Sequence, residues 1–168
     1  MERRFRRRGR KKRMTRNRWI GVILFVCYLA ALLYLMFFSD MEQRGILVKA
    51  DYTYNLLPFR EIRRYLFYGR QIGMGGVLLN LWGNIIGFLP LGFFLPVFSR
   101  RCREYWYDTL LAAYLLSYGI EMTQLLLRAG SCDVDDIILN TLGGGLGYLL
   151  FCLVQRVRSR RYRRRRRS

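Results

Sequence analysis

Three polar residues that could bind or activate a ligand lie close together within a long apolar stretch of the sequence. Glu121, Gln124 and Arg128 are spaced three and four residues apart, so a helix would place them on one face. There Glu121 could act as a general base, and Arg128 could hold a phosphate or a carboxylate group. Because an ionisable side chain inside a membrane is unfavourable unless it is paired or hydrated, such a residue indicates a functional site.

Two other apolar stretches also carry polar residues at helical spacing. The stripes consist of Asn80, Asn84 and Gly87 in one stretch, and of Asp133, Asp136, Asn140, Gly144 and Gly147 in the other. The second stripe shares one face only if its helix starts early. With a rise of about 1.5 Å per residue, all the stripes lie between the outer interface and the membrane midplane. The candidate ligand-binding residues are therefore Asn84, Glu121, Gln124, Arg128, Asp133, Asp136 and Asn140.

The same residues could instead form a purely structural network between helices. Glu121 would then pair with Arg128 or hydrogen-bond the asparagines. The Gly-x-x-x-Gly motifs at 83–87 and 143–147 favour close packing of the helices in that region. Two interpretations follow, a pocket that opens outward and binds a ligand, or a network that only joins the helices.

The composition excludes several kinds of catalytic and metal site. The chain has no histidine, which excludes His-containing triads, His-ligated zinc and haem with a proximal histidine. The cysteines are far apart and form no Cys-x-x-Cys pair, so we expect no disulfide framework, no metal site and no cofactor. They are Cys27, Cys102, Cys132 and Cys152.

Four apolar stretches are long enough to cross a membrane as helices, which takes roughly 20 mainly apolar residues each. They are 19–38, 72–98, 109–127 and 137–154. So many apolar runs in 168 residues leave almost no polar surface to cover a soluble core. We therefore predict an all-α protein, a four-helix transmembrane bundle with a short amphipathic segment in its first outer loop.

The basic residues predict how the chain is oriented. Of 30 Lys and Arg, eleven lie in residues 1–18 and nine in 156–168, which we interpret as basic cytoplasmic tails around a membrane domain at 19–155. The loop 99–108 carries three basic residues, whereas 128–136 carries one. Because cytoplasmic loops are rich in Lys and Arg, we expect a multi-pass protein of the cell membrane with both termini cytoplasmic. The loops 39–71 and 128–136 would lie outside.

The first of these outer loops contains an amphipathic pattern after Pro58. Its apolar members are Leu57, Phe59, Ile62 and Leu66, and its charged members are Arg60, Glu61, Arg63 and Arg64. The pattern is typical of a short helix lying in the membrane interface. An ordinary loop packed on the bundle is the alternative.

Several motifs together resemble the VanZ-like membrane proteins. They are the run from Asn84 to Gly92, the Glu121-x-x-Gln124 pair, Arg128 followed by Asp133-Val-Asp-Asp136-Ile-Ile-Leu-Asn140-Thr-Leu-Gly143-Gly144, and the segment Asn55-Leu-Leu-Pro58-Phe59. The resemblance covers about 19–155 and leaves the arginine-rich tails outside. It implies a small multi-pass membrane protein of bacteria, whose namesake is linked to resistance against the glycopeptide teicoplanin.

These observations favour a non-enzymatic binding protein that takes a lipid-linked cell-envelope precursor or a lipophilic glycopeptide antibiotic in an outward-facing polar pocket. The alternative is a membrane-embedded enzyme that acts on such a precursor with Glu121 and Arg128, and a transporter is third. The expected partners are membrane lipids, to which the basic tails are attracted. We expect no nucleic acid, because no base-reading or stacking module accompanies the charge.

Overall fold

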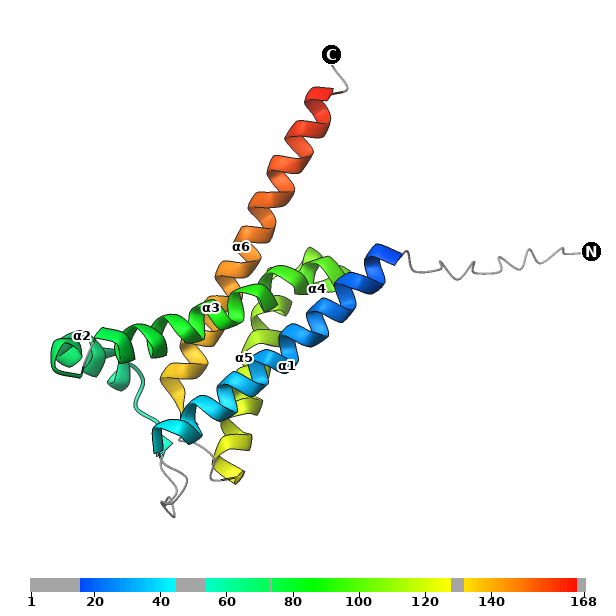
Figure 1. Cartoon of the computed structure of the whole chain (residues 1–168). Coiled ribbons are helices and arrows are strands. Elements are labelled where there is room, and N and C mark those ends of the chain that lie inside the picture. Colours follow the sequence, from blue (N-terminus) through cyan, green and yellow to red (C-terminus); the bar gives the residue numbers. More distant parts are fainter. Residues whose placement is uncertain (1–15, 45–53, 73, 128–131, 166–168) are drawn as a thin grey trace, which may run out of the picture.

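The structure is a computed structural model that describes residues 16–44, 54–72, 74–127 and 132–165 (Figure 1). Within these ranges the chain is almost entirely helical. The elements in chain order are α1 (Arg16–Arg44), β1 (Tyr54–Asn55), α2 (Arg60–Ile72), α3 (Met74–Phe98), α4 (Arg100–Glu104), α5 (Trp106–Leu127), β2 (Cys132–Asp133) and α6 (Val134–Arg165).

Four of the helices are long and apolar enough to cross a membrane. The apolar segments are Trp19–Phe37, Leu81–Phe98, Trp106–Leu127 and Val134–Arg160, on α1, α3, α5 and α6. Many large apolar side chains on them are exposed, such as Leu24 and Leu126. Exposed apolar surface on this scale fits contact with lipid. The predicted all-α fold with four membrane-spanning helices is confirmed.

Two element boundaries differ from the sequence-based expectation. Helix α6 begins at Val134 rather than near 137, and it continues to Arg165, beyond the expected end of the membrane domain at 155. The basic residues from Arg156 to Arg165 therefore continue the helix. Arginine is a good helix former, and neither glycine nor proline interrupts the segment after Gly147.

Glycines bring α3 and α6 into backbone contact. A side chain added at Gly143 or Gly147 would collide with the backbone carbonyl groups of Ile85 or Leu89 in α3. The motif at 143–147 thus packs as expected of small residues between membrane helices. The motif at 83–87 does not supply the other half of this contact, because Gly83 faces open space and Gly87 lies against Leu32 of α1. The glycine of α3 that meets α6 is Gly92, which lies against the carbonyl of Gly144.

The buried core lies where α1, α3 and α5 meet. It consists of Leu32, Phe88, Leu91, Ala113 and Ile120. The hydroxyl group of Tyr28 on α1 also donates to the carbonyl of Gly87 on α3. These contacts hold α1 against α3 and α5 (Figure 1).

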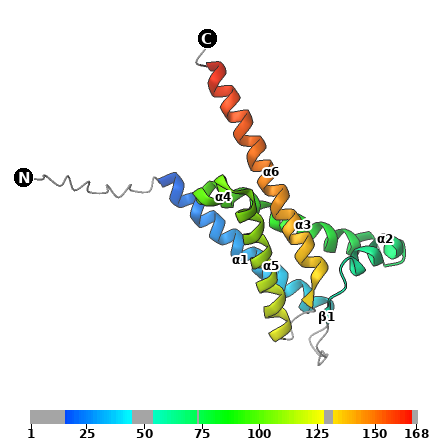
Figure 2. The ribbon, with the colours of Figure 1, turned by 180° about the vertical axis from the view of Figure 1, so that it is seen from behind.

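The two loops that were expected on the same side of the membrane meet at one end of the bundle. Strands β1 and β2 pair in parallel, with Tyr54 opposite Cys132 and Asn55 opposite Asp133. The start of α1, the short helix α4 and the extended part of α6 lie toward the other end, as Figures 1 and 2 show. We call the end with β1 and β2 the strand end, and the other the basic end.

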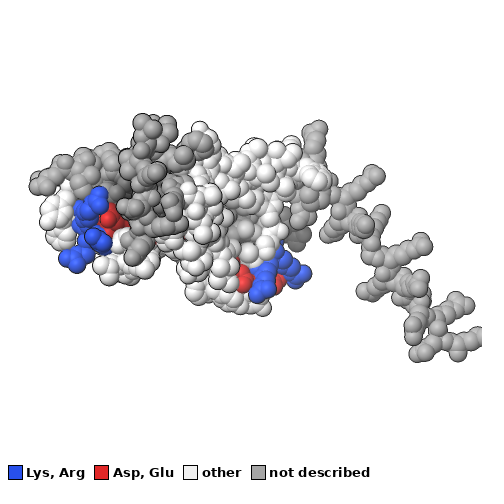
Figure 3. Space-filling view, turned by 90° about the horizontal axis from the view of Figure 1, so that it is seen from below, with Lys and Arg blue, Asp and Glu red and all other residues white. Residues whose placement is uncertain are grey.

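The amphipathic segment after Pro58 is confirmed as a helix, α2, which lies beyond the start of α3 (Figure 2). Figure 3 shows two separate groups of charged side chains, one over α2 and one toward the basic end. In the second group, Arg100 pairs with Glu104 at 2.8 Å and Arg101 with Asp108 at 2.8 Å.

Candidate functional site

Asp133 is the N-cap of α6 and the centre of a polar cluster at the strand end. Its Oδ1 accepts a hydrogen bond from the backbone N–H of Asp135 at 2.9 Å, as N-cap carboxylates do. The same oxygen accepts from the Nδ2 of Asn55 on β1 at 3.2 Å. The backbone N–H of Asp133 donates to the Oε2 of Glu121 at 2.9 Å. Asp133 therefore joins β1, α5 and the start of α6.

Asp135 is a site residue that the sequence interpretation missed. It is 1% exposed, and its carboxylate accepts from the backbone N–H groups of Phe59, Glu61 and Ile62 at 2.5, 2.8 and 3.2 Å. Such N–H groups at the start of a helix lack partners within it and lie at the positive end of its dipole. An aspartate on α6 thus supplies the cap of α2, 76 residues earlier in the chain.

The backbone at Phe59 is unusual in a way that this cap explains. Phe59 has a φ of 65°, a left-handed conformation that bulky residues rarely adopt. Strained backbone persists where the surrounding structure holds it in place. Here the Phe59 N–H is bonded to Asp135, and the chain turns directly into α2.

Asp136 and Asn140 face two different helices. The Nδ2 of Asn84 on α3 donates to the Oδ1 of Asp136 at 2.5 Å, and the Nδ2 of Asn140 donates to the Oγ of Ser117 on α5 at 2.9 Å. The stripe expected on one face of this helix therefore divides among several partners. The reason is that Asp133 precedes the helix, while α3 and α5 approach α6 from different directions.

Glu121 and Gln124 are both buried on α5, which agrees with the predicted shared face. Glu121 is 3% exposed and contacts Asp133 as described above. Gln124 bonds elsewhere, since its Nε2 donates to the carbonyl of Met36 on α1 at 3.0 Å. Arg128, and with it the predicted Glu121–Arg128 pair, lies outside the described residues, as does the side chain of Asn80.

The structure therefore brings Asn84, Glu121, Asp133, Asp136 and Asn140 together around the first turns of α6, and adds Asn55, Ser117 and Asp135. Two buried oxygens of this cluster, the Oδ1 atoms of Asn55 and Asn140, have no hydrogen-bond donor among the described residues. Buried polar atoms are nearly always bonded, so these two can accept from water or from a ligand. No group of three acidic or cysteine side chains within the described ranges could hold a metal ion.

Burial is the main influence on the titration of Asp133. It raises the pKa of this carboxyl group above the ordinary aspartate value, and the hydrogen bonds from Asp135 and Asn55 only partly oppose this effect. The native protein then binds its proton more tightly than the unfolded chain does. Stability that depends on Asp133 is therefore complete below the ordinary aspartate pKa, and it is lost as the pH rises through the raised native pKa.

We accordingly expect Asp133→Asn to raise the unfolding temperature at pH 7. The amide Oδ1 can still accept from Asp135 and Asn55, whereas the buried charge is gone. The difference in unfolding temperature between variant and parent should shrink as the pH falls from 8 to 4.5, because the parent carboxylate becomes protonated. Thermal unfolding of variant and parent in lipid nanodiscs measures this difference across the pH range. A difference that does not depend on pH would contradict a raised pKa of Asp133.

Next to the capped end of α2 lies a basic hollow of about 520 Å³. We call it the arginine hollow, and its lining residues are Arg60, Arg63, Arg64, Phe67 and Tyr68. Arg64 also pairs with Glu61 at 3.1 Å. From the sequence, these arginines were predicted only to belong to an amphipathic helix. The exposed aromatic residues Phe67 and Tyr68 follow Arg64 by three and four residues. This grouping of arginines with aromatic rings was the feature of the sequence that could have indicated a binding surface.

Comparisons with known proteins agree with this architecture. Residues 25–155 match the family described as VanZ/LLP1, nearly the whole of the predicted membrane domain. The chain is similar to Protein VanZ of Enterococcus faecium, with 31% identity over 134 residues, which are 77% of this chain and 72% of that protein. No solved structure matches the chain significantly. The chain therefore belongs to the VanZ/LLP1 family of multi-pass membrane proteins.

Proposed function

We propose that this protein binds a polar, anionic ligand that is anchored in the outer leaflet, either a lipid-linked cell-envelope precursor or a lipophilic glycopeptide such as teicoplanin. The observation that carries the proposal is the cap that Asp135 provides for α2. It ties a helix bearing three arginines and two exposed aromatic rings to the same end of the bundle as the buried polar cluster.

The chemistry of the arginine hollow fits the headgroup of such a ligand. A guanidinium group binds phosphate or carboxylate through paired hydrogen bonds. Phe67 and Tyr68 offer apolar surface at a level where amphipathic helices and aromatic residues meet the membrane interface. The hollow adjoins the start of α2, whose backbone N–H groups bond Asp135 of the cluster.

The carboxylates of the cluster support binding and positioning more than catalysis. Asp133, Asp135 and Glu121 each accept hydrogen bonds from backbone N–H groups, which fixes them in place. A general base needs its carboxylate within reach of the proton that it removes. The buried position of Glu121 keeps the enzyme hypothesis as the second candidate, in which Glu121 would act with Arg128.

Binding can be measured with the protein in nanodiscs and with a fluorescent polyprenyl-diphosphate precursor or fluorescent teicoplanin as the probe. Arg60→Gln and Arg63→Gln should each weaken binding about tenfold or more, because a hydrogen bond to a charged group contributes roughly 1.5–3 kcal/mol. Arg100→Gln, on α4 at the basic end, is the matched control and should leave the affinity unchanged. Equal affinities in all these variants would overturn the proposal.

The same samples separate binding from catalysis. After incubation the precursor is extracted and analysed by mass spectrometry. Recovery of unchanged precursor supports a binding protein. Conversion to a product that is lost in Glu121→Gln would establish the enzyme instead.

The orientation is part of the proposal, since the strand end must face outward. The loop 128–136 carries one basic residue, and the loop 39–71 carries six spread over a longer segment. The strands β1 and β2, one from each loop, pair at this end. In a cysteine-free background, single cysteines at positions 45 and 131 should react with an impermeant maleimide on intact cells. Cysteines at 12 and 160 should react only after lysis, and labelling at 160 on intact cells would reverse the orientation.

A further inference from the structure

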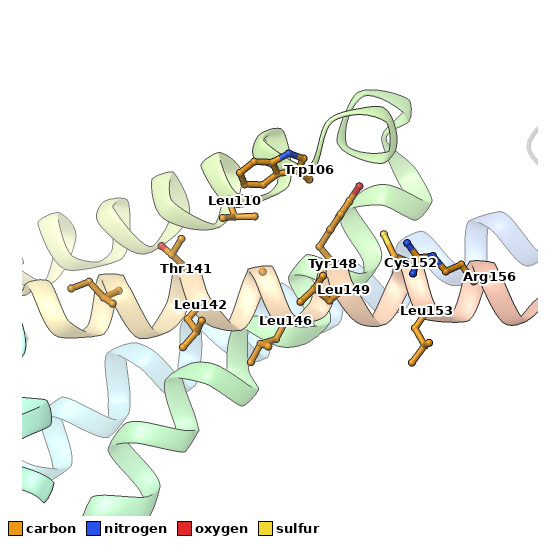
Figure 4. Close-up of a pocket in the computed structure, with 12 residues that line it drawn as sticks. Trp106, Leu110, Thr141, Leu142, Leu146, Tyr148, Leu149, Cys152, Leu153 and Arg156 are labelled. Carbon is orange, nitrogen blue, oxygen red and sulfur yellow. The ribbon is translucent and has the colours of Figure 1, made fainter.

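An apolar groove runs along α6 from Ile138 to Arg156, beside the start of α5. It encloses about 840 Å³ (Figure 4). Leu110 comes from α5, and the leucines at 142, 146, 149 and 153 come from α6. All four leucines of α6 are 40% exposed or more, so the wall of the groove is open to the surrounding lipid.

The aromatic and charged side chains of the groove gather at its basic end. Trp106, at the first position of α5, lies near Tyr148 of α6, and Arg156 lies further along α6 (Figure 4). Tryptophan and tyrosine are enriched where membrane meets water. Arg156 is the first charged residue after the apolar run of α6, which marks the level of the headgroups.

The groove is longer than the acyl region of one leaflet, which spans about half of the bilayer core. Ile138 and Arg156 are 18 residues apart, which corresponds to about 27 Å along a helix. The hydrocarbon core of a bilayer is about 30 Å thick. An acyl chain that starts near Arg156 can therefore lie along the leucines of α6 without leaving the groove.

The charge at the end of the groove selects an anionic headgroup. No described residue forms an ion pair with Arg156, whereas the nearby acidic residues of the basic end, Glu104 and Asp108, are paired with Arg100 and Arg101. Arginine binds phosphate through paired hydrogen bonds, and basic pockets between membrane helices are known to hold anionic lipids.

We propose that the groove is a binding site for an anionic phospholipid, with its phosphate at Arg156 and an acyl chain along α6. The headgroup end of the site, at Arg156, lies at the basic end of the bundle, and the site is independent of the ligand proposed for the arginine hollow.

Trp106 offers a built-in reporter for this site. Replacing Trp19 and Trp82 with phenylalanine leaves Trp106 as the only tryptophan of the chain. This protein is reconstituted in phosphatidylcholine nanodiscs that contain a small fraction of either brominated phosphatidylglycerol or brominated phosphatidylcholine. Bromine quenches tryptophan fluorescence only at contact. We expect half-maximal quenching at a mole fraction of brominated phosphatidylglycerol about fivefold lower than that of brominated phosphatidylcholine. The reason is that one arginine near anionic headgroups contributes about 1 kcal/mol.

Arg156→Gln should abolish this preference. Arg158→Gln is the matched control, because it removes the same charge from the same helix but lies on the opposite side of α6, outside the groove. A preference that is unchanged in Arg156→Gln, or lost equally in both variants, would show diffuse attraction and overturn the site. Equal quenching by the two lipids would also overturn the site. So would a dimeric protein, by size-exclusion chromatography, in which neither lipid quenches Trp106.

Discussion

Replacing Gly147 with alanine is expected to prevent α6 from packing on α3. The new methyl group would overlap the carbonyl of Leu89, the amide nitrogen of Phe93 and the Cα of Gly92, all of them backbone atoms of α3. Backbone atoms cannot rotate away as a side chain can. Overpacking typically lowers the free energy of unfolding by about 1–3 kcal/mol, and we expect a value at or above the upper end of that range.

Gly83→Ala is the matched control, because the same residue type in the apolar part of α3 has nothing within 4 Å of an added methyl group. Alanine favours the helix over glycine by up to about 1 kcal/mol, so this variant should unfold at the parent temperature or above it. Thermal unfolding in nanodiscs, together with the yield of monodisperse protein, compares the two. Equal unfolding temperatures for Gly147→Ala and Gly83→Ala would contradict the crossing of α3 and α6.

Asp135→Asn should release the start of α2 from the bundle. Aspartate accepts from three N–H groups through both oxygens, whereas asparagine would place an NH₂ group against at least one of these donors. A buried donor left without an acceptor lowers stability by about 1–3 kcal/mol. Because α2 carries the arginine hollow, ligand affinity should fall along with stability.

Hydrogen exchange with fragment-resolved mass spectrometry can test this directly. Protection of the amides at 59, 61 and 62 should be lost in Asp135→Asn, while the amides of α4 exchange as in the parent. Glu104→Gln removes a carboxylate from an exposed pair and serves as the control, since such pairs contribute little to stability. Protection at 59–62 that survives Asp135→Asn would show that another contact holds α2.

The spans and the amphipathic helix could be predicted because both depend on local patterns. Apolar length identifies a membrane helix, and the alternation of arginines with apolar residues after Pro58 identified α2. The rotation of each helix about its axis is not a local property. This is why Gly83, which belongs to a Gly-x-x-x-Gly motif, faces open space, while Gly92 makes the contact with α6.

The polar cluster shows the same limit. The sequence identified most of its members, because buried Asn, Asp and Glu are conspicuous in apolar stretches. It could not identify their partners, since Asp135 meets residues more than 70 positions away and the N-cap role of Asp133 depends on where α6 begins. Asp135 was missed because it falls off the single helix face on which the stripe had been placed.

Photo-crosslinking at the arginine hollow tests the central claim most directly. A benzoylphenylalanine replaces Phe67, which is 76% exposed on α2, or Leu115, which is exposed on α5, as the reference position. Irradiation with labelled polyprenyl-diphosphate precursor or labelled teicoplanin should label position 67. This labelling should be reduced by unlabelled ligand and should be lost in Asp135→Asn. Labelling that is equal at 67 and 115, or unchanged by Asp135→Asn, would contradict a ligand site at the strand end.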